Sequence, residues 1–303
     1  MMYVFTIMED KMSKVAIITD SNSGISQSYA EQLGIYVVPM PFIIDEETYY
    51  EDISLNREQF YSKLLDDAEI STTQPSPDYI MNLWNTLLGQ EGYDEIVHIP
   101  MSSGLSGSCS TAMALSKEDD FEGKVYVVDN QRISVTQRRA VMDAVEMARE
   151  GKSAKEIHDK LMDMKFESSI YIMVDTLKYL KKGGRVTPAA AALGTILKLK
   201  PVLQIQGEKL DAFAKARTIT QAKSLMLKAV KNDIETRFGG DVNDVWIAFA
   251  HTENMEEIEI FKEEFLKMYP DYPAEQIVID HLSLSVSCHI GPGSLAIACT
   301  KKM

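Results

Sequence analysis

The feature that most limits the fold of this chain is a repeated alternation of short apolar runs with amphipathic segments. Residues 15–19 form a β-rich apolar run that ends in the polar stretch 20–24, and similar runs occur at 95–99 and 125–129. The segment after Ser76 instead has the spacing of one helical face, with apolar side chains at Ile80, Leu83, Trp84, Leu87 and Leu88. Strands that alternate with helices predict a parallel sheet covered by helices.

The second half of the chain repeats this alternation after a change in composition. Residues 151–167 are mostly polar and helical in pattern, and strands are then predicted at 170–174, 202–205, 246–250 and 277–279, with a helix over 220–237 among them. A length of 303 residues agrees with about two domains. We therefore expect an extension at 1–13, an N-terminal α/β domain with a parallel sheet at 14–165, and a second α/β domain at 166–303.

Charge and cysteine content exclude several classes of function. The net charge of −14 disfavours binding to the phosphate backbone of nucleic acids. The three cysteines are an odd number without a Cys/His cluster, so we expect neither a disulfide framework nor a metal site. No apolar run reaches the roughly 18–20 residues that span a bilayer, and the N-terminus lacks the pattern of a signal peptide. We expect a cytoplasmic protein with reduced thiols and no transmembrane segment.

Hydroxyl-rich loops follow the predicted strands. Asp20 and Ser21 end the first strand, the segment 102–108 follows the strand at 95–99, and 71–73 precedes a helix. Ligands of open α/β sheets bind beyond the carboxyl ends of strands, where hydroxyls and free N–H groups at helix starts can hold an anion. Asp20 could orient one of these hydroxyls. Serine, threonine and glycine are also ordinary turn and cap residues, and that interpretation stays open.

Other segments predict chemistry less strongly. Ser106 lies in Gly-Leu-Ser-Gly-Ser, which departs from the G-x-S-x-G pattern of hydrolases at its last position, and the sequence has no phosphate-binding loop. The basic stretch 181–185 indicates either a loop that faces an anion or a partner, or a solvated turn. His289 stands beside a Gly-Pro-Gly turn, and the small-residue helix expected at 189–197 favours core packing or leaves room for a ligand.

Taken together, these segments resemble the DegV family, the fatty-acid-binding subunits of bacterial fatty-acid kinase. The resemblance covers about residues 14–300, and the segments that carry it are 15–21, 71–76, 102–108, 127–129, 179–186, 199–202 with Arg217 and Thr218, and 289–293. It implies two α/β domains with a long-chain fatty acid buried between them. It also implies a separate ATP-binding kinase subunit as the partner, with no catalytic site and no cofactor in this chain.

The resemblance also assigns roles to individual residues. It implies that Thr72, Thr73 and Ser103, with Ser102 adjacent, bind the fatty-acid carboxylate, and that His289 joins them. Arg185 matches an arginine associated with the phosphorylation step, and Asp20 and Ser21 belong to a supporting loop. Thr73 stands where serine is usual and keeps a hydroxyl, whereas Ile290 replaces a common threonine and has no polar group to contact the carboxylate.

Two other classes of function remain open at this stage. The chain could be a stand-alone enzyme, either a serine hydrolase or a small-molecule kinase, in which case the pure protein would turn over its substrate. It could also be a lipid-responsive regulator that has no kinase partner. For a fatty-acid carrier, burial of about 14–16 methylenes supplies about 11–13 kcal/mol before the costs of ordering and association.

Overall fold

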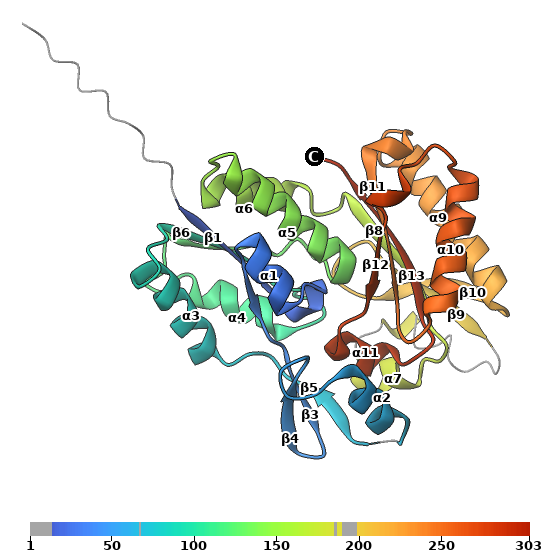
Figure 1. Ribbon diagram of the computed structural model, residues 1–303, viewed down its shortest axis with the longest axis horizontal. Helices are drawn as coiled ribbons and strands as arrows, with labels where there is room; N and C mark the ends of the chain where they lie inside the picture. The colour runs from blue at the N-terminus through green and yellow to red at the C-terminus, as the bar shows by residue number, and fades with distance from the viewer. Residues whose placement is uncertain (1–13, 67, 185–186, 190–198) are drawn as a thin grey trace, which may run out of the picture.

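The computed structural model describes residues 14–66, 68–184, 187–189 and 199–303, and in these parts the strands form three sheets (Figure 1). The first sheet has four parallel strands in the order β2-β1-β6-β7. Its strands and helices are β1 (Val15–Asp20), η1 (Ser21–Ser23), α1 (Gln27–Leu33), β2 (Tyr36–Val38), α3 (Pro77–Gly89), β6 (Glu95–Ile99), α4 (Gly107–Leu115), β7 (Val125–Val127), α5 (Ser134–Arg149) and α6 (Ala154–Asp163).

Helices cover both faces of this sheet, as the alternation of strands and helices predicts. Ile17 and Val97 pack against α1, α5 and α6, whereas Ile18 and Ile96 pack against α3 and α4 on the opposite face. A strand that is buried on both faces is apolar at nearly every position, which explains the continuous apolar runs in the sequence. The parallel N-terminal sheet is therefore confirmed.

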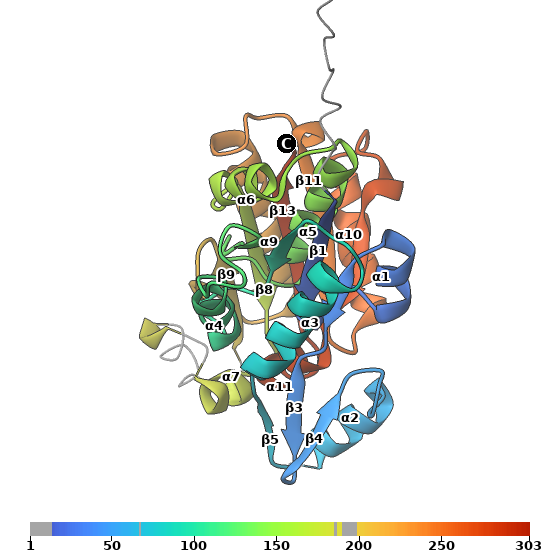
Figure 2. The same ribbon diagram turned by 90° about the vertical axis from the view of Figure 1, so that its left-hand side faces the viewer.

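A second, smaller sheet is antiparallel and was not expected from the sequence. It has the order β4-β3-β5 and consists of β3 (Pro41–Ile44), β4 (Glu47–Tyr50) and β5 (Ile70–Thr72), with α2 (Arg57–Leu65) between the last two strands. Its hairpin turns at Asp45 and Glu46, which adopt positive φ angles of 50° and 72° without a glycine to signal the turn. Figures 1 and 2 show that this sheet projects from one end of the molecule.

The third sheet has six strands in the order β10-β9-β8-β13-β11-β12, of which only the β11–β12 pair is parallel within the part of the chain described. Its strands and helices are β8 (Ser168–Met173), α7 (Lys178–Gly183), β9 (Lys200–Ile205), β10 (Asp211–Ala216), α9 (Ile219–Thr236), η2 (Val242–Asp244), β11 (Val245–His251), α10 (Met255–Met268), η3 (Ala274–Gln276), β12 (Val278–His281), α11 (Leu284–Ile290) and β13 (Leu295–Lys301).

The four strands predicted in this half are confirmed as β8, β9, β11 and β12, whereas β10 and β13 were missed. The chain passes from the first sheet to the third between α6 and β8. The domain boundary near residue 165 stays a prediction. Helices α9 and α10 cover one face of the third sheet, and the opposite face lies toward the N-terminal half.

The basic segment 181–185 differs from the predicted loop. Lys181 and Lys182 lie in the last turn of α7, which ends at Gly183 and is capped by Gly184 with a φ angle of +67°. Positive side chains are favourable there because the carbonyl groups at a helix C-terminus carry partial negative charge. Arg185 and most of the helix expected at 189–197 lie outside the described residues.

One apolar cluster joins the first and third sheets, and we call it the inter-sheet core. Its members from the N-terminal half are Met40, Met101, Leu105, Ile133 and Val135. They pack on the inner face of the third sheet, on residues such as Ile172, Leu203 and Ala296. Because both halves supply side chains to this core, a space within it is enclosed by both.

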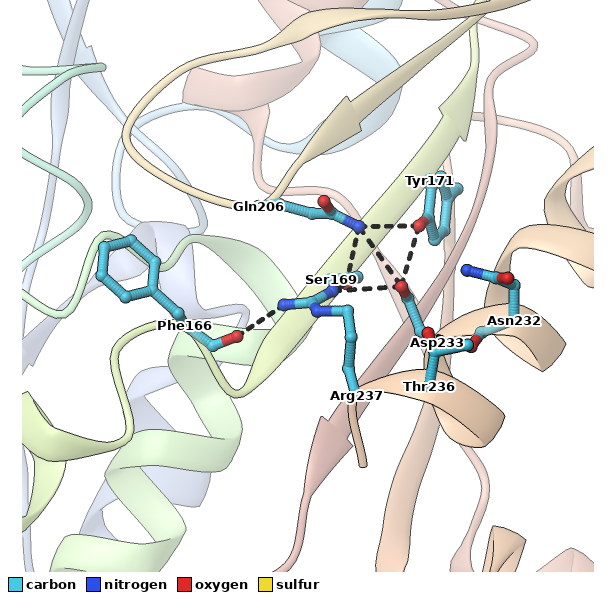
Figure 3. A network of polar contacts seen from close by, with 8 residues as sticks. All are labelled: Phe166, Ser169, Tyr171, Gln206, Asn232, Asp233, Thr236 and Arg237. Atoms are coloured by element: carbon cyan, nitrogen blue, oxygen red, sulfur yellow. Dashed lines mark hydrogen bonds and ion pairs between the residues drawn. The ribbon is translucent and has the colours of Figure 1, made fainter. Parts of the chain in front are cut away.

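A buried polar network attaches α9 to the third sheet (Figure 3). The side chain of Asp233 accepts a hydrogen bond from the Tyr171 hydroxyl at 2.8 Å and pairs with Arg237 at 3.2 Å. The Gln206 side-chain amide donates to the Tyr171 hydroxyl oxygen at 2.8 Å, and Arg237 donates to the Phe166 carbonyl at 2.6 Å. Asp233 is only 2% exposed, so its carboxylate depends on these partners in place of water.

We predict that Asp233→Ala destabilises the protein. The substitution leaves the Tyr171 hydroxyl and the Arg237 guanidinium without their shared partner, and the free energy of unfolding should fall by about 3 kcal/mol. The matched control is Glu235→Ala on the same helix, since Glu235 is exposed and makes a 3.7 Å ion pair with the equally exposed Lys231. The control should change the free energy of unfolding by less than about 0.5 kcal/mol. Equal effects of the two variants in urea unfolding would contradict the role of the network.

Candidate functional site

A cavity of about 280 Å³ lies in the inter-sheet core, beside the small sheet and α11. Its apolar wall combines Met40, Met101, Leu105 and Ile133 with Leu180, Leu210, Val286 and Ile290. Its polar lining consists of Asn22, Thr72, Thr73, Gln74, Ser106, Ser285 and His289. An apolar space with a few converging polar groups is the usual form of a small-molecule site, and such sites typically measure about 300–1,000 Å³.

Three of the predicted site residues meet at this cavity. Thr72 is the last residue of β5 and His289 lies near the end of α11, and Thr72 Oγ1 is 2.9 Å from His289 Nε2 although 217 positions separate them. Thr73 follows and also lines the cavity. If the His289 Nε2–H donates to Thr72 Oγ1, the hydroxyls of Thr72 and Thr73 can both donate hydrogen bonds to an anionic group.

Helix α11 places His289 because its two sides face different surroundings. Leu284 and Cys288 pack with Phe42 and Phe60 in the apolar core of the small sheet. The opposite side of the helix carries Ser285, Val286, His289 and Ile290 to the cavity. The packing of Leu284 and Cys288 therefore fixes the helix in the orientation that brings His289 to the cavity.

Two glycines allow close approaches around α11. A Cβ atom on Gly183, at the end of α7, would lie 2.3 Å from His289 Nδ1. A Cβ atom on Gly291 would lie 2.3 Å from the Tyr179 ring, and Gly291 also has a φ angle of +79°. Gly183 and Gly291 are therefore needed for the close packing of α7 on α11. The sequence had indicated only that glycines form turns here.

Asp20 and Ser21 lie behind the cavity wall. The Asp20 carboxylate accepts hydrogen bonds from the backbone N–H groups of Met101, at 2.7 Å, and Asn22, at 3.0 Å, and from the Gln137 side chain at 3.2 Å. Burial raises the pKa of Asp20, and these hydrogen bonds limit the rise. The Ser21 hydroxyl accepts a hydrogen bond from the Met40 N–H at 3.0 Å. Both residues thus hold backbone next to the cavity, and their functional role stays a prediction.

Ser102 and Ser103 are not among the residues that line the cavity. The Ser103 hydroxyl donates to the Asp129 carboxylate at 2.7 Å, and the Ser102 hydroxyl donates to the Glu208 carbonyl at 2.9 Å. In this arrangement both hydroxyls donate to protein acceptors, so neither is available to donate to a ligand. The prediction that they bind a carboxylate is untested by these contacts.

Sequence reasoning missed several polar residues of the lining. The Asn22 side-chain oxygen accepts hydrogen bonds from the hydroxyls of Ser283, at 3.2 Å, and Ser285, and its amide contacts Met101 Sδ at 2.9 Å. Asn22 thereby joins the loop after β1 to the start of α11. The alternation of serine with apolar residues over 283–288 is the sequence signal that could have indicated a polar lining contributed by this segment.

No group of three or more metal-ligating side chains was found in the described residues. Nor does any helix in those parts of the chain combine the length and the apolar character needed to cross a membrane.

Residues 14–302 match the family described as "Uncharacterised protein, DegV family". The chain belongs to the DegV family. Protein DegV of Bacillus subtilis is 31% identical over 286 residues, which cover 93% of this chain and 98% of that protein. A DegV-family protein from Thermus thermophilus, described by its fatty-acid binding, is 27% identical with a TM-score of 0.85, over 95% of this chain and 99% of that one.

A second solved structure agrees equally well with this DegV-family chain. The fatty-acid-binding DegV-family protein from Streptococcus agalactiae is 27% identical with a TM-score of 0.85, and the match covers 96% of this chain and all of that one. The similarity extends over both large sheets, so the predicted two-part α/β fold is confirmed by comparison as well as by the structure itself.

We predict that Gly183→Ala disturbs the placement of His289. Because the new Cβ atom would collide with the imidazole, α7 and α11 must move apart, and the free energy of unfolding should fall by about 1–3 kcal/mol. Gly89→Ala is the control, since a Cβ atom there meets no atom within 4 Å beyond its own stretch of helix, and Gly89 is the last residue of α3. The control should be neutral or more stable by up to about 1 kcal/mol. Urea unfolding measures both, and an unaffected Gly183→Ala would contradict the close packing.

Proposed function

We propose that this chain binds a long-chain fatty acid in the inter-sheet cavity and presents its carboxylate to a separate ATP-dependent kinase subunit, which forms the acyl phosphate. The cavity carries the first part of the proposal, because an apolar wall leads to a polar cluster at Thr72, Thr73 and His289. The solved relatives from Thermus thermophilus and Streptococcus agalactiae, both described as fatty-acid-binding, support the same ligand.

The chemistry of the lining suits the two ends of such a ligand. Leu180, Leu210 and Ile290 offer apolar surface for an acyl chain, whose burial contributes about 0.8 kcal/mol per methylene. A carboxylate that leaves water needs several hydrogen-bond donors, because an unpaired buried charge is very costly. Hydroxyls and an imidazole can supply these donors without a permanent ion pair, which leaves a carboxylate oxygen available to attack a phosphoryl group.

We assign the carboxylate contacts in two groups. Thr72, Thr73 and His289 already line the cavity and are proposed as the first group, in which the Thr72 hydroxyl accepts the His289 Nε2–H and keeps its own hydrogen for the ligand. Ser102 and Ser103 remain in the proposed set, but each must exchange its present partner to reach a ligand. We therefore expect a smaller energetic contribution from Ser103 than from Thr72.

The kinase partner is the finer part of the proposal. It rests on the resemblance of the sequence segments and on the absence of any phosphate-binding loop from the sequence, which leaves the nucleotide to another protein. Arg185 is proposed to serve the encounter with that kinase or the charge that develops on the transferred phosphoryl group.

The stand-alone enzyme is the competing proposal, and no contact among the described residues favours it. Ser106, the candidate nucleophile, caps α4 by accepting the Ser108 N–H at 3.2 Å. A serine hydrolase needs a base beside the hydroxyl, and the His289 Nε2 atom contacts Thr72. Turnover of acyl esters or ATP by the pure protein, lost in Ser106→Ala, would decide for the enzyme.

We predict that the protein purified from a bacterial host carries close to one fatty acid per chain. Mass spectrometry of an organic extract would identify the acyl chain, and titration of the delipidated protein with palmitate would measure binding. Retention should follow from the apolar wall, since transfer of the acyl chain back to water costs about 0.8 kcal/mol per methylene. An extract without fatty acid, together with no binding of palmitate or oleate, would contradict the proposal.

We predict that binding and phosphorylation respond to different substitutions. Thr72→Val keeps the volume and removes one donor to a charged group, so palmitate binding should weaken by about 10- to 150-fold, equivalent to about 1.5–3 kcal/mol. Arg185→Ala should bind palmitate normally and fail to form acyl phosphate with the kinase subunit. A binding titration beside a coupled phosphorylation assay measures both.

Ser103→Ala is the internal comparison in this experiment. It should weaken palmitate binding less than Thr72→Val, because the wild-type serine must first give up its hydrogen bond to Asp129. If Arg185→Ala lost palmitate binding as severely as Thr72→Val, the separation of roles would be wrong.

A further inference from the structure

Glu51 contacts the helix that carries the polar end of the cavity. Its side-chain Oε2 accepts a hydrogen bond from the backbone N–H of Leu284 at 2.8 Å. Leu284 is the first residue of α11, and Glu51 directly follows β4, so the contact joins positions 233 residues apart. The first N–H groups of a helix have no partner within the helix, and an acceptor there stabilises the first turn.

Glu51 lies outside the cavity that we assign to the fatty acid. It lines a second cavity, of about 520 Å³, on the other side of the start of α11. Ser285 and His289, by contrast, follow Leu284 on the helix and line the first cavity. Glu51 therefore acts on the first cavity indirectly, and α11 is the element that it contacts directly.

The backbone around Glu51 fixes the direction from which the carboxylate approaches. Glu51 pairs with Leu55 in an isolated β-bridge, and Asp52 next to it has a φ angle of +57°. Leu55 is buried in the same apolar core as Leu284. The segment that carries Glu51 and the first turn of α11 thus pack on one core, which limits their relative movement.

We propose that Glu51 is a positioning residue of the fatty-acid site, which holds the first turn of α11 and thereby determines where Ser285 and His289 meet the ligand. The inference rests on the proposed function for the identity of the ligand. The contact between Glu51 and α11 is independent of that proposal. Loss of the acceptor should let the first turn of α11 open, and His289, one turn further along, would then lose its fixed distance from Thr72.

Charged and titratable groups face Glu51 from several elements. They are Asp52 beside it, Arg57 and Tyr61 on α2, Asp280 and His281 on β12, His251 on β11, and Arg138 on α5, which lies 3.9 Å from Asp280. Burial raises the pKa of Glu51 to about 7, with smaller opposing contributions from the Leu284 N–H and from Arg57. At slightly acid pH the side chain is therefore largely neutral, so glutamine is a close replacement for it.

The same shift gives a signature in the stability of the protein. The pKa of Glu51 is higher in the folded state than the ordinary 4.5, so the folded state holds this proton more tightly than the unfolded state does. Its contribution to stability is present below about pH 4.5 and is lost as the pH rises through about 7. The urea midpoint of the wild type should therefore fall between about pH 5 and pH 8 relative to that of Glu51→Gln.

The test compares Glu51→Ala and Glu51→Gln with the wild type in two measurements. Amide hydrogen exchange of Leu284–Ile290 in the delipidated protein reports on α11 without any ligand, and titration with palmitate reports on the site. Glu51→Ala should speed exchange in α11 by about tenfold and weaken palmitate binding by a similar factor. Glu51→Gln keeps the acceptor and should restore both to within about threefold of the wild type.

Glu47→Ala is the matched control, because Glu47 lies on β4, is exposed, and accepts the Tyr49 hydroxyl at 2.7 Å. It should leave exchange in α11 and palmitate binding as in the wild type. The inference is overturned if Glu51→Ala leaves both unchanged, or if Glu51→Gln is as impaired as Glu51→Ala. A wild type that never binds palmitate, with α11 still loosened in Glu51→Ala, would instead overturn the proposed function.

Discussion

The two-sided packing of α11 is the constraint on which the rest of the candidate site depends. The helix has only seven residues, too few to be stable by itself in water. Leu284 and Cys288 fix one side in the core of the small sheet, and the other side borders the cavity. Because the small sheet supplies both Thr72 and part of the core on which α11 packs, this peripheral sheet helps to set the distance between Thr72 and His289.

Polar contacts join the loops of the cavity wall to one another, in addition to the apolar packing. Asn22 joins the loop after β1 to the serines at the start of α11, and Asp20 joins the same loop to the end of β6. Each contact replaces water around a buried polar group, so each is costly to break in isolation. The cavity wall is therefore made of loops that would be mobile alone but are tied to one another across the inter-sheet core.

Much of the fold could be predicted from the sequence because buried strands and amphipathic helices leave clear periodic patterns. The apolar runs at 15–19 and 95–99 and the amphipathic segment after Ser76 correspond to β1, β6 and α3. The small sheet could not be predicted in this way. Its strands have three or four residues, and its turn uses aspartate and glutamate in a conformation that usually indicates glycine.

The candidate site could be predicted only where a local segment of the sequence is recognisable by itself. Thr72, Thr73 and His289 were identified through the resemblance to a family, and the structure brings them to one cavity. Asn22, Ser285 and Glu51 were not predicted, because their contacts join segments more than 200 residues apart. No local pattern in a single sequence records such a contact, whereas a hydroxyl-rich loop such as 102–108 can be recognised from its own residues.

The order of strands in the third sheet bears on how the protein is made. Strand β13 is the last of the sheet in the chain, yet it lies between β8 and β11 and pairs with both. While the ribosome is still extending the chain, the two groups of strands on either side of β13 have no partner to join them. The inner face of that sheet supplies the floor of the inter-sheet core. The nascent protein must therefore protect an unfinished apolar surface until residues 295–301 emerge.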